Sequence, residues 1–361
     1  MLGAMRRGLR SLASLAAVSG AAISVSGACS PNAVCKIAGP INDPSNRTLR
    51  RNIMSFGLGQ FCEQVTTRSA PLKLAPDAPV IGRFFPQRCV QRTLENGDLW
   101  VQIGGFGYAW TNLSKKVTFT CAATIQYNQD FRCADDDAIY AYFDSRDSSA
   151  APAPDFRVVQ IEQPLGSLVQ NWIAPFADAF GRQLVSAQLA QGFTVIRDRN
   201  GSLDYGVGHW SVGTRPFHPL GARGGRVVYE NLRTEVHWGE RDFIGPIAVE
   251  GDGEAIFLQM HLEGAAALDV FILPKSEGDA SLQLYFQYGP AGPLAFSPRF
   301  SDVVQYGGEY QRAVRVPAGM YYVVIDNTPS AGQVAVPAPP IGALADPAAV
   351  VDYAIQVGDA P

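Results

Sequence analysis

The chain has 361 residues, 47% of them apolar and 17% charged, with a formal net charge of −4. That much apolar material excludes a wholly disordered chain. The absence of a basic excess argues against binding to a nucleic-acid backbone. A length of more than twice the usual ~150 residues per domain predicts two domains.

The first 28 residues have the pattern of a secretion signal. Three arginines precede an uncharged stretch of apolar and small residues over 12–25, and the triplet 26–28 (Ser-Gly-Ala) offers a small-residue cleavage site. We therefore expect an exported protein of the periplasm, outer membrane or cell surface of a bacterium. Residues 29–45 are expected to be an extended or disordered N-terminal segment.

Cys29 follows the signal directly, at the place where a bacterial lipoprotein carries its acylated cysteine. Gly27 and Ala28 resemble the residues before such a cysteine, while Ser26 replaces the usual aliphatic residue. Lipid attachment at Cys29 leaves five cysteines, an odd number for disulfides, whereas ordinary cleavage leaves six that can pair fully. Both alternatives place the chain outside the cytoplasm, where disulfides persist.

All six cysteines lie before residue 134, and none has the spacing of a zinc site. We expect disulfides to form instead. Cys62 is placed to pair with Cys89 across the extended segment between them. Cys121 and Cys133 flank a segment as the two strands of a hairpin would, which favours a second pair.

Hydrophobic spacing over residues 46–212 predicts an α+β domain. Apolar residues at helical spacing predict a helix over 46–68. The clearest helix covers 164–191, with a kink at Pro175, and a hairpin over 193–207 follows it. Alternating runs predict strands over three segments: 99–103, 117–120 and 139–143.

The pattern of apolar residues changes in the second half of the chain. The Pro-, Gly- and Arg-rich stretch 213–226 predicts a linker, and residues 227–361 contain short alternating runs separated by turns. Such a series without a helix predicts an all-β sandwich. The expected fold is thus a helix on a curved antiparallel sheet, followed by an all-β sandwich. The predicted strands begin at or near Ile256, Leu268, Leu282, Val314, Tyr321 and Ala349.

The histidines, serines and carboxylates of the sequence form no known catalytic or metal-binding motif. The four histidines lack a spacing such as HExxH, and the segment 209–213 lacks the first glycine of a nucleophile elbow. The acidic runs 135–137 and 250–254 fit solvated turns better than calcium sites. We expect no metal, no cofactor and no enzymatic activity. An enzyme would need His209 and His237 to meet beside a carboxylate.

Aromatic residues of the first half are the remaining candidates for function. Most aromatic side chains in such a domain fill the core. A helix lying along a curved sheet also leaves an elongated apolar cavity, and such cavities take acyl chains or similar ligands. We expect the ligand-binding residues to be Phe106, Trp110, Trp172, Phe176 and Phe180.

The order of elements over about 40–210 resembles bacterial lipoproteins of the tubular lipid-binding superfamily. It consists of a signal ending in cysteine, a helix, strands with a glycine-punctuated apolar stretch, a long amphipathic helix and the hairpin GFTVIRDRNGSLDYGVG. The resemblance implies a long helix packed into a highly curved sheet around an apolar groove. The segment 316–327 (VPAGMYYVVIDN) resembles sandwich domains of secreted bacterial proteins, such as pre-peptidase C-terminal domains. That likeness implies an accessory adhesion or stabilising module.

Two hypotheses follow for the function. The first is a non-enzymatic secreted or envelope protein that binds a lipid or other apolar small molecule in its N-terminal domain. The alternative is a surface-recognition or structural protein with a packed core, which binds through the C-terminal sandwich. A continuous cavity beside Trp172 and Phe176 would favour the first. Nucleic acid is not an expected partner, and the sequence identifies no protein partner.

Overall fold

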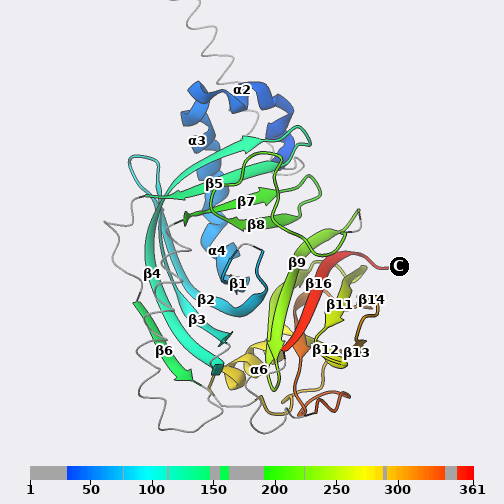
Figure 1. Ribbon diagram of the computed structural model, residues 1–361. Helices are drawn as coiled ribbons and strands as arrows, with labels where there is room; N and C mark the ends of the chain where they lie inside the picture. The colour runs from blue at the N-terminus through cyan, green and yellow to red at the C-terminus, as the bar shows by residue number, and fades with distance from the viewer. Residues whose placement is uncertain are drawn as a thin grey trace, which may run out of the picture.

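The computed structural model describes residues 31–75, 77–111, 114–146, 155–161, 191–222, 224–287, 291–337 and 348–361. The fold is mostly β, and its described strands form one large sheet and one smaller sheet (Figure 1). Short helical segments precede the first strand. They are η1 (Pro31–Ile37), α2 (Ala38–Asn42), η2 (Pro44–Asn46), α3 (Arg47–Gly57), η3 (Leu58–Gln60) and α4 (Phe61–Thr66).

The N-terminal half of the large sheet is built around the 20-residue strand β4. One edge of β4 pairs with β3, and the other edge is shared, because β5 pairs with residues 127–133 and β6 with residues 117–122. The sheet curves strongly along β2, β3 and β4 (Figure 1). The strands of this half are β1 (Ala70–Lys73), β2 (Val80–Thr93), β3 (Leu99–Thr111), β4 (Ser114–Cys133), β5 (Ile139–Ser145), β6 (Asp155–Ile161), β7 (Phe193–Arg197) and β8 (Leu203–Val207).

Glycines in β3 allow a close approach to the neighbouring strand. A Cβ at Gly105 would lie 2.2 Å from the carbonyl oxygen of Phe85, and one at Gly107 would lie 2.5 Å from that of Arg83. The glycine-punctuated stretch therefore continues the strand, beside a shift of the β2–β3 register between residues 86 and 88. The predicted hairpin over 193–207 is confirmed as β7 and β8.

The N-terminal helices pack on one face of this sheet. Met54, Leu58 and Phe61 belong to an apolar cluster with residues of five strands, β2, β3, β4, β5 and β7. The odd-numbered residues of β3 and β4 in it point to the same face of the sheet. Helices occupy 47–66, where the spacing predicts one, and η3 interrupts them beside Gly57 and Gly59. The strand residues of this cluster include Leu99, Val101, Ala123, Ile125, Tyr127 and Phe143.

The described residues of the segment 29–45, which the sequence predicts to be extended or disordered, are instead helical apart from Asp43. Ile41 is buried, and the Asn42 side chain bonds both the N–H and the carbonyl of Cys133 at 2.9 and 2.8 Å. These contacts with the distant strand β4 order the segment. Local composition alone could not predict them.

The C-terminal half consists of two sheets that face each other across one apolar core, the arrangement of a β-sandwich. The order β14-β11-β16-β9 forms the first layer and β10-β15-β12-β13 the second. Inward residues such as Val236, Ile244, Ile256 and Val323 fill the space between them. The strands are β9 (Val227–His237), β10 (Arg241–Val249), β11 (Glu254–Glu263), β12 (Ala267–Pro274), β13 (Phe300–Gln305), β14 (Tyr310–Arg315), β15 (Gly319–Asp326) and β16 (Ala348–Asp359).

One predicted strand of this half is a helix. The alternation of Leu282, Leu284 and Phe286 predicts a strand, but the segment forms α6 (Lys275–Gln287). Leu282 and Tyr285 are buried three residues apart, whereas Leu284 is 45% exposed, so the buried face has helical spacing. This half is therefore a sandwich of two sheets with one helix added, and it is not all-β.

The two halves share the large sheet. β2 of the first half lies beside β9 of the second, and Val80 pairs with Thr234 in parallel. The linker predicted over 213–226 connects β8 to β9 without regular structure in its described residues. Hydrogen bonds hold it near both ends. The Arg215 guanidinium donates to Asp198 at 2.6 Å, and the Asn231 side-chain amide bonds both the N–H and the carbonyl of Leu220.

The helix predicted over 164–191 lies outside the described residues apart from its last position, Gln191, which is helical. The prediction of a long helix on the curved sheet therefore stays a prediction. Within the described part of the chain, no helix is long and apolar enough to cross a membrane.

Candidate functional site

Two of the predicted ligand-binding aromatics lie between the halves. Trp110 is 1% exposed, and its indole N–H donates to the Tyr285 hydroxyl at 3.3 Å. Phe106 packs against Phe85 and Phe286, with ring centroids 5.6 and 4.8 Å away. Trp110 is buried, and Phe106 partly buried, in the apolar cluster that β3 shares with α6. Their part in ligand binding stays a prediction.

The remaining predicted binding residues, Trp172, Phe176 and Phe180, lie outside the described residues. Cys29, the predicted site of lipid attachment, does so as well. The predictions for these four residues stay predictions.

Two disulfides cross-link the first half. Cys62 is bonded to Cys89, as the sequence predicts. Cys133 is bonded to Cys35 and not to Cys121, because Cys121 and Cys133 belong to one continuous strand rather than to a hairpin. Disulfides are typical of proteins in an oxidising environment outside the cytoplasm.

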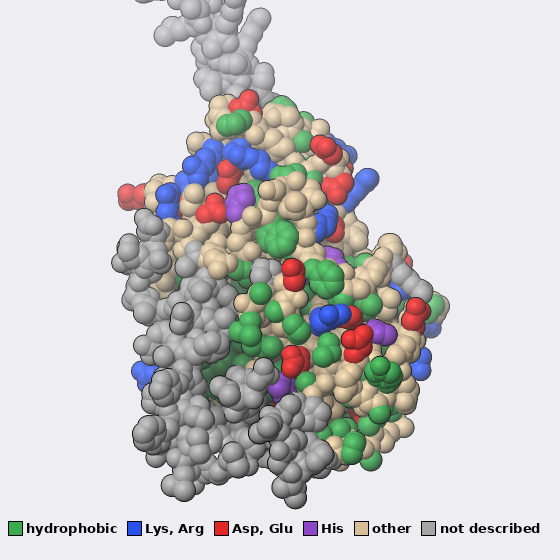
Figure 2. Space-filling model, viewed as in Figure 1, with side chains coloured by type: hydrophobic (Ala, Val, Ile, Leu, Met, Phe, Trp, Pro, Cys, Tyr) green, Lys and Arg blue, Asp and Glu red, His purple; other side chains and the backbone are tan. Residues whose placement is uncertain are grey.

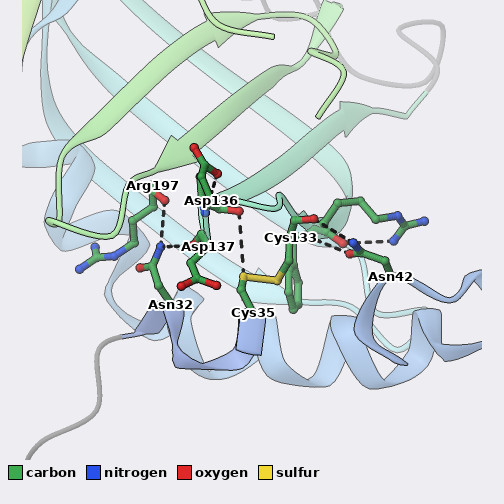
Figure 3. The surroundings of a disulfide bond; sticks show 10 residues. Asn32, Cys35, Asn42, Cys133, Asp136, Asp137 and Arg197 are labelled. Carbon is green, nitrogen blue, oxygen red and sulfur yellow. Dashed lines mark hydrogen bonds between the residues drawn. A yellow bond between two sulfur atoms is a disulfide. The ribbon is translucent and has the colours of Figure 1, made fainter. Parts of the chain in front are cut away.

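The Cys35–Cys133 bond joins the N-terminal helical segment to the end of β4 (Figure 3). Beside it, the Asn32 side chain donates to the backbone carbonyls of Asp137 and Arg197 at 2.8 and 3.0 Å. The disulfide and these hydrogen bonds hold the first helical turn against the ends of three strands.

Cys121 has a free thiol that is 7% exposed. It packs beside Leu72, Phe119 and Phe156, and burial raises its pKa to about 11. A thiol of that pKa is protonated near neutral pH and is a poor nucleophile.

Each of the four histidines lies within ion-pair distance of a carboxylate. His209 stacks on the ring of Tyr142, with centroids 4.0 Å apart, and its Nδ1 lies 3.2 Å from Asp144. His237 lies beside Glu235 at 3.3 Å. Among the described residues, no three His, Cys, Asp or Glu side chains are grouped so that they could hold a metal ion.

The two acidic runs form turns. Residues 135–137 connect β4 to β5, where the Asp136 carboxylate accepts from the N–H of Ala138. Residues 250–254 connect β10 to β11, where the Glu254 carboxylate accepts from the N–H groups of Glu250 and Gly251. Both carboxylates bond the backbone of their own turn.

A buried ionic network, which the sequence did not predict, joins the halves at the shared sheet. Arg83 of β2 is fully buried and donates to both carboxylate oxygens of Asp242 on β10, at 2.6 and 3.2 Å. Its Nη1 donates to Glu230 at 3.1 Å, and its Nη2 donates to the Tyr353 hydroxyl at 2.7 Å as well as to Asp242. Burial lowers the pKa of Arg83, but the charges of Asp242 and Glu230 raise it more.

Hydroxyl groups complete this network. Tyr353 donates to Glu230 at 2.7 Å, and Tyr108 donates to Asp242 at 3.0 Å. The Tyr108 oxygen in turn accepts from the backbone N–H of Phe243 at 2.7 Å. Because each charge has a partner and most of the group is inaccessible to water, the network fixes the junction and offers no site for a ligand.

A small cavity lies beside this network, between the end of α4 and strands β8, β9, β10 and β15. Its volume is about 230 Å³, below the roughly 300–1,000 Å³ of pockets for drug-sized ligands. Apolar side chains and two tyrosine rings form most of the wall, and polar side chains from the end of α4 form one side. The lining residues are Gln64, Thr67, Arg68, Leu203, Tyr205, Tyr229, Pro246, Ala248 and Met320.

The polar side of the cavity carries a positive charge. The Arg68 guanidinium lies 4.6 Å from the centroid of the Tyr229 ring. Tyr205 is half exposed, and burial raises its pKa while the charges of Arg68 and Arg197 lower it. The arrangement can hold a small molecule that has an apolar body and a group complementary to a guanidinium.

Sequence reasoning missed this cavity because its walls come from five elements separated by up to 256 positions. No periodicity connects residues so far apart. Arg83, by contrast, gave a usable signal, since it is a lone charge in the otherwise apolar run 79–86. A charge in such a run is seldom buried without a partner.

No protein-family model matches the chain, and no curated protein matches it either.

Proposed function

We propose that this chain is an exported, non-enzymatic protein of the bacterial cell envelope that binds a small apolar ligand. The observation that carries the proposal is the cavity at the junction, where Leu203, Pro246, Ala248 and Met320 present apolar surface around a hollow that is partly open to solvent. A concave apolar site with a few polar groups is the usual form of a small-molecule site. The two disulfides agree with export.

The binding site proposed here differs from the groove that the sequence suggests. Phe106 and Trp110 are packed against α6 and its neighbours, so they support binding only indirectly, by holding the halves together. The resemblance to tubular lipid-binding lipoproteins and to pre-peptidase C-terminal domains remains part of the proposal, as an indication of compartment and ligand class.

We also propose that Cys29 is acylated. Cys35 is committed to Cys133, and Cys62 to Cys89. Residues 31–35 lie in a 3₁₀ segment, which rises about 2 Å per residue, so Cys29 reaches at most ~15 Å from Cys35. Cys121 lies twelve residues along β4 from Cys133, a path of about 40 Å. Four of the described cysteines are therefore paired with one another and the fifth, Cys121, is a buried free thiol, so an odd cysteine is present in the fold and cysteine parity does not argue against acylation.

Membrane fractionation tests the anchor. We expect the wild-type protein in the membrane fraction, with an acyl-modified N-terminal Cys29 in the intact-mass spectrum. Cys29→Ser should move the protein to the soluble fraction. Cys121→Ser is the matched control, because it removes the other unpaired thiol and should leave the protein in the membrane. Retention of the Cys29→Ser variant in the membrane would contradict acylation.

Native mass spectrometry of the protein purified from its own cells tests ligand binding. We expect a co-purified apolar molecule in the wild type and its loss in Ala248→Trp, which places a large ring at the cavity wall. Ala313→Trp is the control, since Ala313 is also an exposed alanine on an edge strand but lies away from the cavity. Equal ligand occupancy in both variants would contradict a binding role for the cavity.

The alternative function, recognition through the C-terminal half with a packed core throughout, is favoured by one observation. Trp110 is fully buried among protein side chains, and Phe106 packs against the same cluster. If no small molecule accompanies the wild-type protein, this alternative becomes the better account.

A further inference from the structure

Arg68 is the one basic residue that lines the cavity. Its side chain is half-buried and rests on the Tyr229 ring. Among the described residues, no Asp or Glu carboxylate lies within ion-pair distance of it, which sets it apart from most arginines of the junction. Arg68 has a side-chain hydrogen bond with Tyr205, whose hydroxyl is neutral, so an anion that binds the guanidinium meets no competing carboxylate among the described residues.

The carboxylates nearest the cavity have other partners. Glu230 bonds Arg83 at 3.1 Å and Tyr353 at 2.7 Å. Asp204 lies 3.0 Å from the His218 Nε2. Neither is committed to Arg68, so the positive charge on this wall of the cavity is uncompensated.

The hydroxyl of Tyr229 is a buried polar group on the cavity wall. Tyr229 is 6% exposed and lines the cavity, and its hydroxyl has no hydrogen-bond partner among the described residues. Burial raises the pKa of Tyr229, so the hydroxyl stays protonated and keeps its hydrogen for donation. A buried hydroxyl without a partner is costly, and a ligand oxygen would satisfy it.

We propose that the cavity binds a small monoanionic amphiphile, a medium-chain carboxylate in chemical terms. The carboxylate pairs with Arg68 and accepts from the Tyr229 hydroxyl, and the hydrocarbon lies against Leu203, Pro246 and Met320. This inference rests on the proposed function, because it names the head group of the apolar ligand that the same cavity takes. It adds that the head group is anionic.

Calorimetric titration of the full chain with octanoate and with octan-1-ol tests the head group. The two probes share a chain length and differ in charge. We expect octanoate to bind the wild type at least ~10-fold more tightly than octan-1-ol, because an arginine–carboxylate pair is a charge-assisted contact. Arg68→Gln should reduce this preference to within about 2-fold, by weakening octanoate alone. Arg68→Lys, which keeps the charge, should restore part of it.

Arg92→Gln is the matched control. Arg92 also rests on an aromatic ring, Trp100, at 4.4 Å, but it does not line the cavity. This variant should bind both probes as the wild type does. Thermal unfolding of each variant, recorded without ligand, shows whether a change in binding reflects a change in folding.

Three results separate the inference from the function on which it rests. Equal affinity of the wild type for octanoate and octan-1-ol would overturn the anionic head group and leave apolar binding standing. A preference for octanoate that survives in Arg68→Gln would also overturn the inference. Failure of both probes to bind the wild type would overturn the proposed function together with the inference.

Discussion

Two buried tyrosines at the junction differ in the partners of their hydroxyl groups. The Tyr353 hydroxyl bonds Arg83 and Glu230, each at 2.7 Å, whereas the Tyr229 hydroxyl has no partner among the described residues. Removing the Tyr353 hydroxyl leaves two buried charged groups short of a hydrogen bond. Removing that of Tyr229 leaves no described group unsatisfied.

Phenylalanine substitutions should therefore have different effects at these two sites. We expect Tyr353→Phe to lower the free energy of unfolding by about 1–3 kcal/mol, and Tyr229→Phe to stay within ~0.5 kcal/mol of the wild type or to exceed it. Urea unfolding followed by far-UV circular dichroism measures both. Similar losses in the two variants would show that an unseen partner bonds Tyr229.

At the scale of elements, the disulfides should contribute unequally to stability. Cys35 and Cys133 are 98 residues apart, and Cys62 and Cys89 are 27 apart. Loop-closure entropy then predicts losses of about 5 and about 3.5 kcal/mol for the paired serine variants. We expect Cys35→Ser/Cys133→Ser to have the lower unfolding midpoint. The reverse order would show that native contacts, rather than the unfolded chain, dominate the effect.

Helix α3 is held to the sheet by ion pairs that depend on pH. Burial raises the pKa of Asp130, but hydrogen bonds with Arg50 and the Phe131 N–H lower it more. The pKa of Asp98 is lowered in the same way, because its side-chain hydrogen bonds with Arg146, Gln126 and Arg51 outweigh the effect of burial. A carboxylate whose folded pKa is depressed stabilises the fold above its unfolded value, near 3.8. That contribution disappears as the pH falls through the lower folded pKa.

We therefore expect the unfolding midpoint to fall steeply below about pH 4. Asp98→Asn/Asp130→Asn should be less stable than the wild type at pH 7 and should lose less on acidification. Thermal melts at pH 7, 4 and 3 measure both slopes. Parallel slopes for the two proteins would contradict the role of these carboxylates.

Local pattern predicted some elements and failed for others, for physical reasons. The hairpin 193–207 carries its own turn residues, so the sequence sufficed. In the segment that forms α6, apolar residues occur both two apart, as in a strand, and three apart, as in a helix. The packing of Leu282 and Tyr285 against the sheet favours the helix. Residues 31–46 are ordered by a disulfide to Cys133, and the pairing of that cysteine could not be deduced from spacing.

At the scale of the whole molecule, the halves should unfold together. They share a sheet, and the Arg83–Asp242 pair across their junction is fully buried. We expect Asp242→Asn to cost about 3–5 kcal/mol, since it leaves the Arg83 charge poorly compensated. Asp155→Asn, in an ion pair with Arg157 that is largely exposed, should cost at most ~0.5 kcal/mol.

Calorimetry shows whether this junction couples the halves. The wild type should give one unfolding transition, and Asp242→Asn should lower or split it. Two separate transitions in the wild type would mean that the halves are stable independently and that the network adds little. On the face shown in Figure 2, acidic and basic side chains of the described residues are interspersed.

The location of the bound ligand tests the central claim, that the junction cavity is the binding site. A photoreactive octanoate analogue that carries a diazirine, irradiated with the wild-type protein and mapped by peptide mass spectrometry, reports that location directly. We predict labelling of peptides that contain Leu203, Tyr229 or Met320, and its suppression by excess octanoate. Labelling confined to residues 164–191, or spread over the surface and insensitive to octanoate, would contradict the claim.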